Sequence, residues 1–193
     1  MKILVLNAGS SSLKYQVIDM PSEEVKCVGL VERIGMEDAI FTHEIENQKQ
    51  SETLPILNHE TGLKKIAATL LDPKIGVINN VEEIEAVGHR VVHGGNKFNK
   101  TTIVNKEVKD NIRELFSLAP LHNPANLTGI EIAETIFTSA KQIAIFDTAF
   151  HQTMPKEAYQ YAIKNEFLED YNIRAYGFHG TSHKYVSEKA RAY

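Results

Sequence analysis

Alternating hydrophobic and polar positions in the first third of the chain predict a set of β-strands. Ile3–Leu6 is a short apolar run that ends in small and polar residues, as a buried strand entering a turn does. Leu13–Ile18 alternates with a period of two, so the polar segment between these runs is expected to be a hairpin connection. Val25–Ile34 predicts a third strand, and weaker strand patterns follow at Phe41–Ile45 and Thr53–Leu57.

Beyond this segment the apolar positions change to helical spacing. Helices are predicted over Thr61–Leu71, Lys106–Leu118 and Asn126–Phe137. Strands are predicted over Ala86–His93 and Gln142–Phe146, the second ending in an aspartate. Three opening antiparallel strands followed by alternating helices and strands indicate an α/β domain with a mixed sheet flanked by helices.

The C-terminal segment predicts one more helix. Thr181 is the expected N-cap, and Tyr185, Val186 and Lys189 follow at helical spacing. The sequence reaches Tyr193 without a glycine, asparagine or proline to end the helix. We therefore expect that the sequence is part of a longer chain.

Composition narrows the classes of protein. The 193 residues are 42% hydrophobic, enough for one or at most two domains. A formal net charge of -4 gives no strong overall attraction to nucleic acid or to an acidic membrane. The single cysteine, Cys27, excludes an intramolecular disulfide and fits a buried strand position and a reducing compartment. No apolar run is long enough for a signal peptide or a membrane span, which predicts a soluble cytoplasmic protein.

The first hairpin carries the first candidate chemistry. Its sequence NAGSSSLK places an amide, three consecutive hydroxyls and a lysine around one turn. Backbone N–H groups and hydroxyls in such a turn can hold phosphate, although the same residues are also common in ordinary hairpins. Neither a Walker A motif nor G-x-G-x-x-G is present.

Arg90 lies inside the apolar strand GHRVVHGG. A buried guanidinium needs an anionic partner, which is either a structural carboxylate or a ligand carboxylate or phosphate. His89 and His93 are four residues apart on the same strand, a spacing that does not form a helical metal pair.

Three further residues stand at places where ligands bind in α/β proteins. His122 precedes a predicted helix in PLHNPAN, where an anion would be favoured, but a loop histidine can also be merely solvated. Asp147 ends an apolar strand and is either a metal-binding or catalytic residue or a turn aspartate. His179 lies between glycines in GFHGTSH, and a zinc site with His183 would lack a third ligand.

Five motifs in this order, NAGSSSLK, GHRVVHGG, APLHNP, FDTAFH and YGFHGTSH, resemble the successive motifs of the acetate kinases. The resemblance implies a ribonuclease H-like domain of the actin and sugar-kinase superfamily. It also implies that residues 1–193 are the N-terminal domain of such a kinase, without the second, adenosine-binding domain. The implied reaction is reversible phosphoryl transfer between ATP and acetate, giving acetyl phosphate and ADP.

The resemblance also implies roles for individual residues. Asn7 would lie at the Mg²⁺ (or Mn²⁺) and phosphate site, with Lys14, Ser10 and Ser12 near the nucleotide phosphates. The catalytic residues would be Arg90, which binds the acetate carboxylate, Asp147, His179 and His122. Val92, Leu121 and Phe178 would form the apolar pocket for the acetate methyl group. Because a carboxylate nucleophile is already ionised at neutral pH, we expect Asp147 to orient the metal ion rather than to remove a proton.

Several alternatives remain open at this point. Propionate kinases share the motifs, and the isolated chain is expected to be inactive and could act only as an anion- or partner-binding module. The implied partners are acetate or acetyl phosphate and ATP or ADP, with no nucleic acid or membrane and with a homodimer in the full-length protein. A ribonuclease H-type nuclease is disfavoured because Asn7, not an acid, occupies the first strand.

Overall fold

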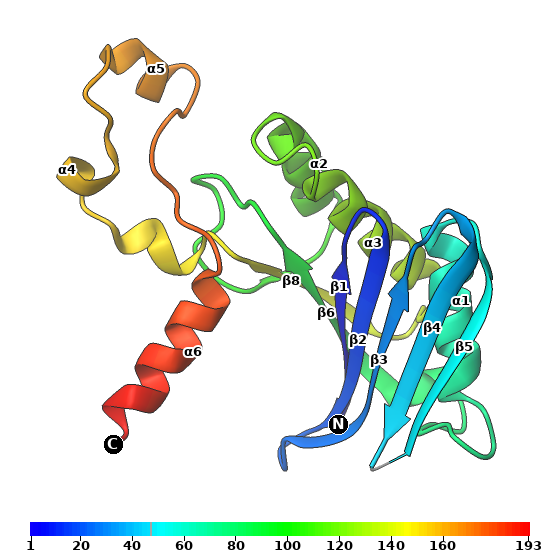
Figure 1. Cartoon of the computed structure of the whole chain (residues 1–193). Helices are drawn as coiled ribbons and strands as arrows, with labels where there is room; N and C mark the ends of the chain where they lie inside the picture. Colours follow the sequence, from blue (N-terminus) through cyan, green and yellow to red (C-terminus); the bar gives the residue numbers. More distant parts are fainter. Residues whose placement is uncertain (47) are drawn as a thin grey trace.

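The computed structural model describes residues 1–46 and 48–193, and within them eight strands form one mixed sheet (Figure 1). The strand order is β5-β4-β3-β2-β1-β6-β8-β7. The strands are β1 (Lys2–Ala8), β2 (Ser12–Asp19), β3 (Glu24–Glu32), β4 (Met36–Ile45), β5 (Gln48–Ile56), β6 (Ile84–Val91), β7 (Thr102–Ile103) and β8 (Lys141–Phe146).

The connectivity of the sheet confirms the predicted α/β class. Strands β1 to β5 form an antiparallel meander, which extends the three expected opening strands by two. Strands β6 and β8 run parallel to β1, and the short β7 pairs antiparallel with β8. This is the ribonuclease H-like arrangement of the actin and sugar-kinase fold, with the first hairpin at the predicted place.

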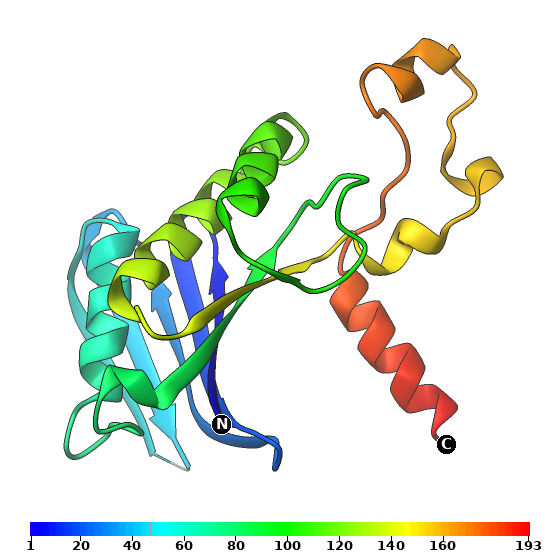
Figure 2. The same ribbon diagram turned by 180° about the vertical axis from the view of Figure 1, so that it is seen from behind.

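The helices are α1 (His59–Leu70), α2 (Lys106–Glu114), α3 (Asn123–Ile136), α4 (Lys156–Tyr159), α5 (Asn165–Glu169) and α6 (Gly180–Arg191). Helices α1 and α3 cover one face of the sheet, whereas α4, α5 and α6 lie away from it (Figure 1). Helices α1 and α3 pack on each other and on the sheet, which Figure 2 shows from behind. Helix α3 begins three residues earlier than predicted, because Pro124 is well suited to a first helical turn. Helix α2 ends at Glu114 and continues as a 3₁₀ turn.

Strand β2 shows how the pattern of the sequence builds the core. Leu13, Tyr15 and Val17 are buried on the side of the helices. The Tyr15 hydroxyl lies 2.6 Å from His43 Nδ1, and His43 Nε2 lies 2.9 Å from the carbonyl of Ile75. Because a carbonyl only accepts, Nε2 carries the proton and Nδ1 accepts from Tyr15. Burial raises the pKa of Tyr15 and lowers that of His43, so both groups stay neutral.

The chain after β8 leaves the sheet. Helices α4 and α5 lie in an excursion away from it, and α6 projects with most of its surface exposed (Figures 1 and 2). Neither α4 nor α5 was predicted, because helices of four and five residues carry too little periodicity. Helix α6 is confirmed, but the predicted N-cap, Thr181, is wrong. His179 is the N-cap residue, in a left-handed backbone conformation, and the helix begins at Gly180.

No helix in the described part of the chain is long and apolar enough to cross a membrane. Cys27 is buried in β3, as predicted, and burial raises the pKa of its thiol to about 11.

His89 is expected to make the fold less stable in acid. Its side chain is buried on β6, Nε2 lies 2.7 Å from Gln142 Oε1, and burial lowers its pKa to about 4. In the unfolded chain this histidine takes up a proton near pH 6.5, whereas in the folded chain it does so only near pH 4. The stability that the neutral side chain contributes is therefore fully present above pH 6.5 and is lost as the pH falls towards 4. Between about pH 7.5 and about pH 4.5 the expected loss is about 2–3 kcal/mol.

Urea unfolding at both pH values measures this effect in the wild type and in H89Q. On acidification, the free energy of unfolding of the variant should fall by about 2–3 kcal/mol less than that of the wild type. A matched H183Q variant, which removes an exposed histidine, should behave as the wild type. An equal loss in H89Q and the wild type would exclude His89 as a source of acid sensitivity.

Candidate active site

Three polar side chains meet where parallel strands end. Asn7 lies at the end of β1, Arg90 at the end of β6, and Asp147 directly after β8. Arg90 pairs with Ile145 in the sheet, and Asp147 follows two positions later on the same face. All three line one cavity of about 610 Å³. Ligands of open α/β sheets bind at this edge, outside the carboxyl ends of the strands.

The anionic partner of Arg90 is Asp147. Arg90 Nε donates to both carboxylate oxygens at 3.1 and 3.0 Å, and Nη2 donates to Oδ2 at 2.6 Å. The hydrogen bonds that Arg90 donates to Asp147 raise the pKa of Arg90 above its ordinary value. The Asp147 side chain is 3% exposed and that of Arg90 is 36% exposed, so the carboxylate is buried and the arginine is accessible to solvent. Within the described residues, the remaining nitrogen, Nη1, has no hydrogen-bond partner.

His179 stands beside this pair. Its Nδ1 lies 3.4 Å from Arg90 Nη2 and 3.9 Å from Asp147 Oδ2. A guanidinium nitrogen only donates, so Nδ1 is the acceptor in the contact with Arg90, which leaves Nε2 as the donor of the ring. The backbone N–H of Gly180 donates to the Asp147 carbonyl at 2.8 Å. This contact anchors the start of α6 to the end of β8 and brings His179 to the carboxylate.

Val92, Leu121 and Phe178, the residues expected to form the apolar pocket, line one cavity of about 360 Å³. His122, Arg90, Asp147 and His179 line the same cavity. It shares Arg90, Asp147 and His179 with the larger cavity that contains Asn7. Leu121 and Phe178 are 74% and 46% exposed, so the rim of the pocket is open.

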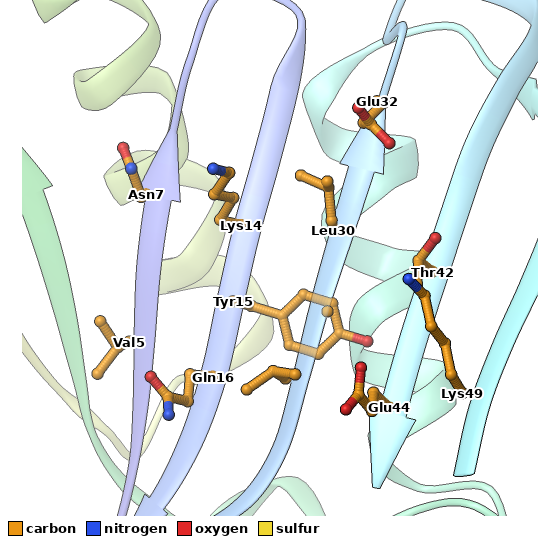
Figure 3. Close-up of a pocket in the computed structure, with 12 residues that line it drawn as sticks. Val5, Asn7, Lys14, Tyr15, Gln16, Leu30, Glu32, Thr42, Glu44 and Lys49 are labelled. Carbon is orange, nitrogen blue, oxygen red and sulfur yellow. The ribbon is translucent and has the colours of Figure 1, made fainter. Parts of the chain in front are cut away.

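Lys14 and the serines lie farther from this centre. Lys14 pairs with Asn7 across β1 and β2, and both line a hollow of about 430 Å³ on the open face of the sheet (Figure 3). Asn7 thus belongs to this hollow and to the 610 Å³ cavity. Ser10 lies in the turn between β1 and β2, and Ser12 starts β2. In the described part of the chain, neither serine lines any of these three cavities.

Two buried asparagines that were not singled out in the sequence hold the site together. Asn126 donates to the carbonyl of Ala8 at 2.6 Å and accepts from the N–H of Val92 at 3.0 Å. Asn123 makes both of its hydrogen bonds with the backbone of His93, at 3.0 and 2.9 Å. The first turn of α3 therefore fixes the ends of β1 and β6. Their spacing of three residues in PLHNPAN, which puts both on one helix face, was the available signal.

Asn7 and Asp147 fit a divalent metal ion that is held partly by substrate. Among the described residues, no three acidic, histidine or cysteine side chains are close enough to form a complete metal cage. Asn7 and Asp147 nevertheless present an amide and a carboxylate to one cavity. Mg²⁺ in phosphoryl-transfer sites is usually held by one or two carboxylates together with water and substrate phosphates, so this donor set is sufficient.

A ribonuclease H-like sheet with an arginine–carboxylate pair and a histidine at its strand ends defines a domain of the actin and sugar-kinase class. The acetokinase family model matches residues 2–193, and the chain belongs to this family. It is 58% identical to the acetate kinase of Flavobacterium johnsoniae over 193 residues, which are 100% of this chain and 49% of that protein. It is 57% identical to the acetate kinase of Symbiobacterium thermophilum, covering 98% of this chain and 48% of that one.

Solved structures of the same family have the same fold as this chain. Porphyromonas gingivalis acetate kinase superposes with a TM-score of 0.93 at 43% identity, over 98% of this chain and 48% of that one. A propionate kinase from Francisella tularensis gives 0.91 at 42% identity, with the same coverage. The chain thus spans about half the length of the relatives it matches.

Proposed function

We propose that these residues are the carboxylate- and phosphate-binding half of an enzyme that transfers a phosphoryl group between ATP and acetate. The observation that carries the proposal is that Arg90, which Asp147 holds through three hydrogen bonds, also lines a small apolar cavity. A guanidinium nitrogen at that place suits a carboxylate, and the apolar wall suits a short alkyl group. In this proposal, residues 1–193 form the N-terminal domain, and the adenosine pocket belongs to the second half.

The charges of the site suit an in-line phosphoryl transfer. Asp147 holds Arg90 in one orientation through three hydrogen bonds, so the guanidinium is fixed before substrate arrives. Nε2–H of His179 can donate to an oxygen of the phosphoryl group in transit, and His122, which lines the same cavity, can add a second donor. The acetate carboxylate is ionised at neutral pH and needs no general base.

A bound Mg²⁺ or Mn²⁺ would neutralise phosphate charge during transfer, and Asn7 and Asp147 are the residues that would hold it. Lys14 faces the same side of the sheet as Asn7 and is proposed to contact the nucleotide phosphates. Ser10 and Ser12 are proposed to do so from the turn. The proposal includes ATP or ADP as co-substrate, a homodimer of the full-length protein and a cytoplasmic location.

Propionate is the second candidate substrate. The chain resembles a propionate kinase almost as closely as an acetate kinase in structure, and the open rim at Leu121 leaves room for another carbon. An apolar pocket separates acids that differ by one methylene by about 1–3 kcal/mol. Because the relatives that are more than half identical to this chain are acetate kinases, we expect acetate to be preferred, by about 10-fold or more in kcat/KM.

The preference is measured in the full-length protein, with these residues joined to a C-terminal half like that of the relatives. Acyl phosphate formation is followed with ATP and either acid. A clear preference for propionate would show that propionate, and not acetate, is the substrate. Turnover by the 193-residue chain alone would show that the second half is not needed for activity. We expect only trace activity from the isolated chain.

A further inference from the structure

His151 lies outside the three cavities, but it contacts the segment that carries two of the site residues. Its Nε2 lies 3.0 Å from the carbonyl oxygen of Phe178. Because a carbonyl only accepts, Nε2–H donates this hydrogen bond. Phe178 lines the acyl pocket, and the next residue is His179. The bond therefore holds the peptide that joins the pocket wall to the histidine beside Asp147.

That peptide belongs to a constrained turn. Gly177 has φ +73° and His179 has φ +54°, so two of three consecutive residues adopt left-handed conformations. For a residue with a side chain this costs about 1–2 kcal/mol, and it persists only where surrounding contacts impose it. A Cβ on Gly177 would come within 2.7 Å of the His151 ring, so the ring packs directly on this turn.

The turn has an anchor on each side of His179. On one side the N–H of Gly180 donates to the Asp147 carbonyl, and on the other His151 donates to Phe178. His151 is itself well fixed, because it lies in a 3₁₀ turn over Phe150–Thr153. The neighbouring Gln152 donates to the carbonyl of Gly95 at 2.9 Å, which fastens this turn to the loop after β6.

We propose that His151 is a positioning residue, which holds Phe178 and His179 in the geometry that phosphoryl transfer requires. It acts through the Phe178 carbonyl and touches no reacting atom. The inference rests on the proposed function, since it assigns the role of a residue in that reaction. Losing the hydrogen bond would release one of the two anchors and let the His179 imidazole move away from Arg90.

Two substitutions test whether the hydrogen bond to Phe178, rather than a polar side chain at position 151, is what matters. In H151Q the amide nitrogen occupies about the position of Nε2 and can still donate, whereas in H151N the shorter amide lies nearer to Nδ1 and falls short. In the full-length protein, H151N should lower kcat about 10²-fold and leave KM for ATP within about 2-fold, because a small misplacement of a catalytic group acts mainly on the transition state. H151Q should recover most of the lost rate.

H183N is the matched control, because the His183 ring packs edge-on against His151 at 5.5 Å but is not bonded to Phe178. It should keep wild-type kcat, and thermal unfolding confirms that each variant is folded. If H151N does not fold, G177A serves instead, since its methyl group displaces the same ring and should lower kcat similarly.

The inference is overturned if folded H151N keeps wild-type kcat, if H151Q is as impaired as H151N, or if H183N is equally impaired. Those outcomes leave the proposed function intact. A wild-type protein that forms no acyl phosphate refutes the proposed function instead.

Discussion

Replacing Asp147 by asparagine is expected to lower kcat for acetyl phosphate formation by about 10³-fold or more in the full-length protein. The carboxylate accepts three hydrogen bonds from Arg90, and an amide can accept only on its oxygen. Its NH₂ group would face the guanidinium, so Arg90 would turn away. The substitution also removes the negative charge proposed to hold the metal ion. Losing a preorganised electrostatic contact of this kind typically costs 10²- to 10³-fold, and here two contacts are lost.

The control for this prediction is D110N. Asp110 is also paired with an arginine, Arg113, at 2.8 Å, but on the exposed surface of α2, where such pairs contribute little. D110N should therefore keep wild-type kcat. Initial rates at saturating ATP and acetate measure both variants. A D147N protein that retains more than about a tenth of the wild-type kcat would remove Asp147 from the reaction.

Replacing Gly180 by alanine is the second change with a large expected effect. A Cβ at this position would lie 2.3 Å from the Asp147 carbonyl oxygen, and a backbone atom cannot move aside as a flexible side chain can. The start of α6 must shift, the hydrogen bond from Gly180 to Asp147 is lost, and His179 leaves Arg90. We expect kcat to fall about 10²-fold or more and the free energy of unfolding to fall by about 1–3 kcal/mol.

Ser187 gives the matched control, since it lies exposed on the same helix. S187A should leave both kcat and the unfolding midpoint unchanged. Steady-state kinetics and urea unfolding of the two variants decide the matter. If G180A has wild-type kcat, the anchor between α6 and β8 does not position His179.

Much of this site was predictable because strands obey a strict period. The apolar runs before Asn7 and Asp147 end at the same edge of the sheet, and Arg90 interrupts a third run at that edge. The family motifs then supplied Val92 and Phe178, which the structure places on the wall of one cavity. The local pattern was sufficient to predict an element wherever that element was long and buried on one face.

The rest depended on contacts between distant segments. That Asp147 is the partner of Arg90 follows from the pairing of β6 with β8, which no local pattern specifies. The N-cap of α6 was misplaced because Thr181 has the better capping side chain, whereas the left-handed turn at His179 is imposed by the contact with Asp147. His151 was missed because its role is carried by one hydrogen bond to a backbone carbonyl 27 residues away.

The central claim is that Arg90, Asp147 and His179 form the acetate side of a phosphoryl-transfer site. The most direct measurement is the initial rate of acetyl phosphate formation from ATP by the full-length protein as the acetate concentration is raised. We predict a rate that rises and saturates with acetate, and a KM for acetate raised about 10-fold or more in R90Q, which loses the carboxylate contact. A rate independent of acetate, or an R90Q variant with unchanged kinetics, would contradict the account.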